Sequence, residues 1–162
     1  MEFIFDTKLV KLYFIMNHSL ETLDFEQIFT NEFGSGYIHE AGKAIMLKAE
    51  SDFIPIKNFK QLFIMLSDEV EENSGKYTKF IFDKSTLRTF HQPSMKWYFT
   101  EWKTKMLELG LTKHFKILPN MDYFKKAVEA ARKPLLAKYP KDVLAKLRIE
   151  YYDTVEDALN AT

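Results

Sequence analysis

From residue 44 onward, short apolar segments alternate with longer segments that are apolar on one face only. Such alternation is typical of βα units, in which a helix connects two parallel strands. The predicted strands cover residues 44–48, 77–83, 113–118 and 146–152, and the helices that follow them cover residues 55–73, 93–109, 121–138 and 154–160. The pattern predicts an α/β fold with a mixed, mostly parallel sheet of four to five strands, flanked by helices.

The helix predicted over residues 93–109 has more apolar surface than one face requires. Its apolar stripe consists of Met95, Phe99, Trp102, Met106 and Leu109. Trp97 and Tyr98 lie beside this stripe. Two interpretations stay open: the helix is unusually well buried, or the two rings form an exposed contact surface.

The first 42 residues follow a different pattern. Residues 3–5 and 9–15 are predicted to be opening strands, and the second is apolar on both faces, as a central strand is. Residues 17–42 are the least periodic part of the chain. Within them, residues 24–29 fit a short helix and residues 33–37, with two glycines, fit a flexible loop. Long loops are often functional, so this segment is a candidate lid or partner-binding element.

The last predicted strand alternates apolar and charged residues. This pattern favours an edge strand with Arg148 and Glu150 on its solvent side. Thr154 is then the predicted N-cap of the closing helix, with Asp157 three residues later in the position of a capping-box acid.

Composition narrows the function classes. The 162 residues are expected to form a single domain, and 46% are hydrophobic, which is enough for a real core. The formal net charge is zero, with 23 basic and 23 acidic side chains. This balance argues against nucleic-acid binding and against docking on acidic membranes. The chain has no cysteine, so thiolate catalysis and cysteine-based metal sites are excluded.

The sequence also bears on the compartment. Residues 1–6 lack the positive start and the apolar run of a signal peptide. No stretch approaches the roughly 18–20 apolar residues that span a bilayer. We therefore expect a cytoplasmic protein.

Common catalytic and cofactor motifs are missing from the sequence. With five glycines, the chain contains neither a Rossmann fingerprint nor a P-loop, and it has no Gly-x-Ser-x-Gly elbow or His-Glu-x-x-His helix. The four histidines, at positions 18, 39, 91 and 114, are far apart and are expected to lie on the surface or to close loops. We expect no cofactor and no metal site.

The carboxyl edge of the predicted parallel sheet is the best place to look for function, because ligands of open α/β sheets bind there. This edge is predicted to carry Asp83, Lys84, Ser85, His91 and Ser94, together with Pro119 and Asn120. Ser94 lies at a helix N-terminus, where oriented N–H groups stabilise an added phosphate. The simpler interpretation is that Ser94 is a first-turn or capping serine.

The order of the elements resembles the STAS-like superfamily, and more narrowly the SpoIIAA-like group, which is similar in shape to the lipid-binding Sec14 fold. The resemblance rests on the βα units, on a buried strand that ends at Asp83 before a helix that begins near Ser94, and on the closing Tyr-Asp-Thr-Val-Glu-Asp-Ala-Leu. It runs from about residue 9 to the end of the chain.

This resemblance implies a regulatory or interaction module rather than an enzyme. In the anti-sigma-factor antagonists, a serine after the third strand, in an Asp-Ser-Ser-Gly-like context, is phosphorylated by a partner kinase. Here no such motif lies between Asp83 and Pro93, and Ser94 occupies the nearest topological position.

Three functional hypotheses follow. The first, which we favour, is a non-enzymatic module that binds a protein partner near the helix starting at Pro93, through Asp83, Ser85, His91, Ser94 and the rings of Trp97 and Tyr98. The second is a domain that binds a small apolar molecule or a lipid in an aromatic-lined pocket. The third is an enzyme with Asp83 and His91 as an acid/base pair. The sequence leaves a homodimer open.

Overall fold

The computed structural model describes residues 20, 22–89, 91–138 and 141–162, and it has an α/β fold. Its mixed sheet has six strands in the spatial order β1-β2-β3-β4-β5-β6. The strands are β1 (Glu26–Thr30), β2 (Gly34–His39), β3 (Ala44–Ala49), β4 (Lys79–Asp83), β5 (Lys113–Ile117) and β6 (Arg148–Tyr151). β1, β2 and β3 are paired antiparallel, whereas β3 to β6 are parallel. The predicted fold class is confirmed; the strands predicted at residues 3–5 and 9–15 lie outside the described residues.

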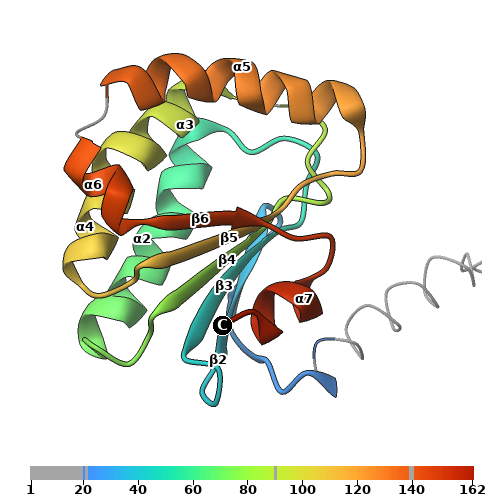
Figure 1. Cartoon of the computed structure of the whole chain (residues 1–162). Helices are drawn as coiled ribbons and strands as arrows, with labels where there is room; N and C mark the ends of the chain where they lie inside the picture. Colours follow the sequence, from blue (N-terminus) through green and yellow to red (C-terminus); the bar gives the residue numbers. More distant parts are fainter. Residues whose placement is uncertain (1–19, 21, 90, 139–140) are drawn as a thin grey trace, which may run out of the picture.

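Each parallel strand from β3 onward is followed by helical structure. The segments are α2 (Ile56–Glu72), α3 (Gln92–Trp97), the π-helical turn η1 (Tyr98–Trp102), α4 (Lys103–Glu108), α5 (Asp122–Lys138), α6 (Lys141–Lys146) and α7 (Val155–Asn160). Consecutive parallel strands joined by right-handed crossovers place their helices on one face of the sheet. Accordingly α2 to α6 cover one face and α7 lies on the other (Figure 1).

The helix expected at residues 24–29 and the loop expected at residues 33–37 are both wrong. These residues form β1 and β2, which pair as a hairpin. Asn31 closes the turn, because its side-chain oxygen accepts the backbone N–H groups of Phe33 at 2.8 Å and Gly34 at 3.0 Å. The sheet therefore has six strands rather than four to five, and two of them lie in the described part of residues 17–42.

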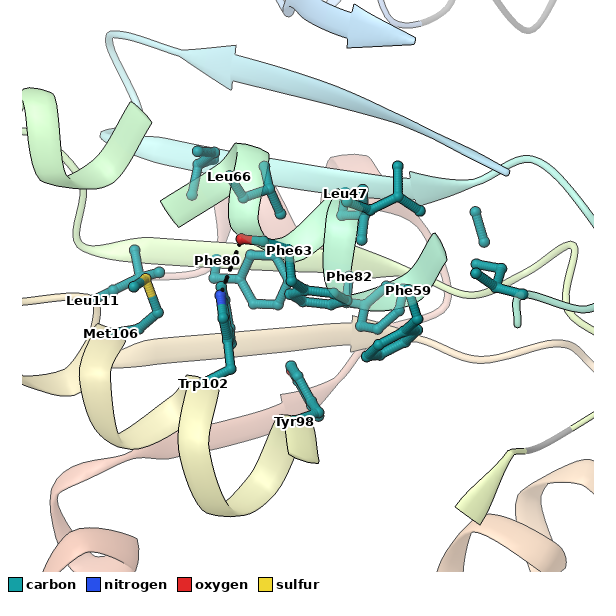
Figure 2. Packing of buried hydrophobic residues seen from close by; sticks show 14 of the residues in the cluster. Leu47, Phe59, Phe63, Leu66, Phe80, Phe82, Tyr98, Trp102, Met106 and Leu111 are labelled. Atoms are coloured by element: carbon teal, nitrogen blue, oxygen red, sulfur yellow. Dashed lines mark hydrogen bonds between the residues drawn. The ribbon is translucent and has the colours of Figure 1, made fainter. Parts of the chain in front are cut away.

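A large aromatic core fills the space between the sheet and the helices. Phe63 of α2 packs edge-on against Trp102, with ring centroids 4.7 Å apart, and Phe80 of β4 lies 4.9 Å from the same indole. The Trp102 N–H donates to the Phe63 carbonyl oxygen at 3.3 Å (Figure 2) and to the Ser67 hydroxyl at 2.9 Å. The tryptophan thus links α2 to the helix that follows β4.

A smaller core lies under α7 on the opposite face. It contains Met46, Ile81, Phe115 and Ala158. α7 begins as predicted, since the Thr154 hydroxyl accepts the Asp157 N–H at 3.1 Å. β6 is the edge strand that its alternating pattern predicted. Within the described ranges, no helix is long and apolar enough to cross a bilayer.

Candidate functional site

The segments that follow the carboxyl ends of β3, β4 and β5 present side chains with rings, two of them in loops and one in the first turn of α5. Phe53 follows β3 and is 40% exposed, and Tyr123 follows β5 and is 60% exposed. His91 follows β4, and its ring meets Phe53 edge-on with centroids 5.8 Å apart. We call Phe53, His91 and Tyr123 the rim surface.

Beneath Phe53 and His91 the surface is hollowed. The hollow is lined by Phe53, Ile54, Phe59, Phe82, Lys84, Leu87, Thr89, His91, Ser94, Met95 and Phe124. Its volume of about 30 Å³ matches the space of a single water molecule. The rim surface therefore offers a shallow, mostly apolar depression rather than a deep ligand cavity.

His91 and Ser94 form a local pair at the start of α3. The His91 ring Nδ1 lies 2.8 Å from the Ser94 hydroxyl oxygen. His91 is also the N-cap residue of α3, and Gln92 and Pro93 are the first two residues of that helix. Ser94 is only 2% exposed, so its hydroxyl is already bonded and largely covered.

Asp83 and Ser85 form a second local pair one loop earlier. Asp83 Oδ1 accepts the Ser85 backbone N–H at 3.0 Å and the Ser85 hydroxyl at 2.6 Å. None of the hydrogen bonds recorded among the described residues joins Asp83 to His91. Sequence reasoning brought the four residues to the same edge, but the structure divides them into two separate pairs.

Tyr98 is not part of an exposed surface, which corrects one of the two interpretations of that helix. Its side chain is completely buried and stacks on Trp102, with centroids 5.5 Å apart and an interplanar angle of 19° (Figure 2). Trp97 is half-buried and packs edge-on against Phe59 at 6.3 Å and Phe63 at 6.2 Å. The helix is covered on more than one side, since α2 contacts α3 and α6 contacts α4.

Three buried lysines form a cluster that sequence reasoning did not anticipate, since it placed Lys84 at the edge of the sheet and did not single out the other two. They are Lys84 directly after β4, Lys103 at the start of α4, and Lys116 in β5, and each is at most 2% exposed. The Lys103 Nζ lies 4.8 Å from the centre of the Tyr98 ring, and the Lys116 Nζ lies 5.2 Å from it. The Lys84 Nζ lies 4.8 Å from the centre of the Phe82 ring. The sequence contained one indication of this burial, because Lys103 lies four residues after Phe99 and so falls on the apolar stripe of its helix.

Burial shifts the titration of these groups. It lowers the pKa of Lys84 to about 7, with a smaller contribution from Arg132. Burial lowers the pKa of Lys103 and Lys116 well below the ordinary lysine value, and the neighbouring cations add to this effect. The pKa of His114, expected on the surface or in a loop, is likewise lowered by burial, because its ring lies fully inside the core.

A larger cavity opens between α5 and β6. It has a volume of about 570 Å³ and is lined by Leu118, Asn120, Lys125, Val128, Glu129, Arg132, Tyr151, Tyr152 and Asp153. Arg132 donates a hydrogen bond to the Tyr151 hydroxyl at 2.7 Å. This lining is mixed polar and apolar, unlike the aromatic-lined pocket considered from the sequence.

The part of the chain that the structure describes contains no group of three or more histidine and acidic side chains placed to hold a metal ion. No family model matches the chain, and no curated protein or solved structure matches it.

Proposed function

We propose that the chain is a non-enzymatic interaction module of the STAS-like, SpoIIAA-like type, and that it binds a protein partner through the rim surface. The observation that carries this proposal is the exposure of Phe53, in the loop after β3, and of Tyr123, in the first turn of α5, at the carboxyl edge of the sheet. Large aromatic side chains gain much free energy when a partner covers them, and they are enriched at the centres of interfaces. The hollow beneath Phe53 gives such a partner a place to insert one small apolar group.

The STAS-like assignment is supported by topology. A parallel β3–β6 sheet with its crossover helices on one face, and a closing strand followed by the short α7, is the order of elements that the resemblance implies. The rim surface lies beside the start of α3, where that resemblance also places the partner.

A phosphorylation switch at this edge has two candidate serines. The Ser94 hydroxyl is buried and bonded to His91, so its modification requires the first turn of α3 to open. Ser85 is only partly buried, but its hydroxyl donates to Asp83. A phosphate there would place negative charge beside a carboxylate, which is repulsive. A switch at either serine would therefore act by loosening the loop before α3.

The double variant Phe53→Ala/Tyr123→Ala tests the rim surface. We expect it to keep the fold, because both side chains are largely exposed, and to lose the partner proteins captured by the wild-type chain. Ile64→Ala is the matched control, since Ile64 is a similarly exposed apolar residue, at 53%, on the outer side of α2. Capture of the same proteins by the wild type and the double variant would refute the proposal.

Binding of a small molecule is a second candidate function. The cavity between α5 and β6 supports it, since its volume falls within the range typical of ligand pockets. Native mass spectrometry of freshly purified protein tests this candidate, and a bound mass that is absent after denaturation would support it.

A further inference from the structure

Several buried polar atoms converge between the sheet, the α3–α4 helix and α5. The Nζ atom of Lys103 and the hydroxyl of Tyr98 are fully buried, and neither has a hydrogen-bond partner among the described residues. The Lys116 Nζ lies 5.0 Å from the centre of the Phe99 ring, and the Lys103 Nζ lies 4.2 Å from the same centre. The Nε atom of Arg132 is also buried and unpartnered there. A buried donor without an acceptor costs free energy, so this cluster is incomplete as it stands.

The cluster is unusual in its charge. Buried cations are normally paired with carboxylates. Yet the charged neighbours that influence Lys84, Lys103 and Lys116 in the described part of the chain are one another and Arg132. His114 faces Lys103 and Lys116, but burial and their charge hold its pKa low, so it adds no negative charge. An anion at this place would give the unpartnered donors an acceptor and would favour the charged form of the lysines.

A route to the cluster leads from the outer cavity. Val128, Arg132 and Tyr151 line both the 570 Å³ cavity and a narrower inner hollow, and Lys116 lies on the wall of that hollow. The inner hollow is too narrow for a water molecule. The hydrogen bond from Arg132 to the Tyr151 hydroxyl lies where the outer cavity meets the inner hollow. An anion that binds Arg132 in the outer cavity replaces this contact. Because the inner hollow has no room for it, the side chains around the hollow must also move apart before the anion reaches Lys116.

We propose that Lys103, Lys116 and Arg132, with the Tyr98 hydroxyl, bind the phosphate group of a small phosphate monoester that enters between α5 and β6. Lys84 adds positive charge from the neighbouring side of the cluster. A dianionic phosphate matches several cations, whereas a carboxylate balances only one of them. The remainder of the ligand occupies the outer cavity, beside Asn120 and Lys125. This inference does not depend on the rim surface.

Calorimetric titration of the full chain with inorganic phosphate and with glycerol 3-phosphate tests the site. We expect both to bind, the ester more tightly, with acetate at equal ionic strength giving no binding. Burial lowers the pKa of each lysine in the free protein, and a bound dianion raises it again, so binding should take up protons. Titrations in two buffers with different ionisation enthalpies measure that uptake. Nonspecific screening of surface charges by the added salt would not produce it.

The variants Lys116→Met and Lys103→Met should each lower the affinity about tenfold or more, because each loses a charge-assisted contact. Both should fold, since methionine fills the space of a buried lysine without a charge. Lys96→Met, an exposed position on α3, is the matched control and should bind as the wild type does.

Three results would overturn the phosphate site. They are phosphate binding no stronger than that of acetate, equal binding by Lys116→Met and Lys96→Met, or the absence of proton uptake. Vesicles that contain phosphatidic acid, which carries the same headgroup, identify the source of the phosphate group. Binding of the soluble ester alone supports a free metabolite, and competition by the vesicles supports a lipid headgroup. The rim variant Phe53→Ala/Tyr123→Ala should keep full phosphate affinity, so this proposal and that of the rim surface can fail separately.

Discussion

Lys79 of β4 donates a hydrogen bond to the backbone oxygen of Ala161, across 2.6 Å, and so ties the central strand to the end of α7. The same ammonium group reaches the oxygens of Ala158 at 2.9 Å and Leu159 at 2.7 Å. The last carbonyl groups of a helix have no partner within the helix and carry its negative dipole end. Lys79 therefore completes α7 on the face of the sheet opposite α2 to α6.

Lys79→Met should destabilise the protein by about 1–3 kcal/mol, because the carbonyl groups lose a charged donor in a buried setting. Urea denaturation at pH 7 measures the difference. Lys76→Met is the control, because the ion pair of Lys76 with Glu40 is exposed and should contribute less than about 1 kcal/mol. Equal stability of the two variants would show that the hydrogen bonds from Lys79 to α7 do not stabilise the protein.

Trp102→Phe should destabilise the protein by about 2–4 kcal/mol through lost packing and through loss of the indole N–H, which bonds the Ser67 hydroxyl. A double-mutant cycle with Ser67→Ala isolates that bond. We expect a coupling energy of about 1 kcal/mol from denaturation curves. A coupling near zero would mean that the indole nitrogen contributes nothing beyond packing.

Gly36→Ala should destabilise the β1–β2 hairpin. A Cβ atom on Gly36 would lie 2.3 Å from the Cε1 atom of Phe29, so the ring would have to leave its place over the strand. Overpacking of this kind costs about 1–3 kcal/mol. In a Phe29→Ala background the same substitution should cost little, and thermal denaturation of the four proteins checks this. A cost that persists without the ring would locate its cause elsewhere.

The stability of the protein should rise with pH above neutrality. The pKa of Lys84 is lowered from 10.5 to about 7 in the folded chain. Between these values the unfolded chain holds a proton that the folded chain does not. The free energy of unfolding therefore increases by up to about 1.4 kcal/mol per pH unit for this group alone. The destabilisation is fully present below pH 7 and is removed as the pH approaches 10.5.

Urea denaturation from pH 7.0 to 9.5 tests this dependence, with Lys84→Met as the variant. We expect the variant to be more stable than the wild type at pH 7 and to show a shallower rise. Lys103 and Lys116 act in the same direction, so some rise should remain. An identical slope in the two proteins would contradict a neutral Lys84 in the folded state.

Periodicity predicted the βα units well, because their apolar spacing is set by a core that covers each element on one side. The helix predicted over residues 55–73 is α2 (Ile56–Glu72), and its buried residues Phe59, Phe63 and Val70 lie on the expected face. The β1–β2 hairpin was missed because Gly34, Ser35 and Gly36 have turn-forming composition. In the structure the ring of Phe29 fills the space that a side chain at Gly36 would take.

The candidate site was predicted in position but not in detail. Asp83, Ser85, His91 and Ser94 gather after β4, as parallel strand order requires, but their pairing depends on loop conformation that periodicity does not encode. The burial of Lys84, Lys103 and Lys116 was not predicted, because lysine is rarely fully buried. Only the packing of α5 and β6 around Lys116 reveals that its amino group lies inside the protein.

Titration of the lysine side chains by NMR, in protein labelled with ¹³C-lysine, tests the central claim of this account most directly. That claim is that Lys84, Lys103 and Lys116 share a buried space without a carboxylate partner among the described residues. We predict that the Cε signal of Lys84 titrates near pH 7 and that those of Lys103 and Lys116 titrate well below the ordinary lysine pKa. Met substitutions assign the three signals, and phosphate should raise all three pKa values. Titration of every lysine signal near its ordinary pKa of 10.5 would contradict the claim.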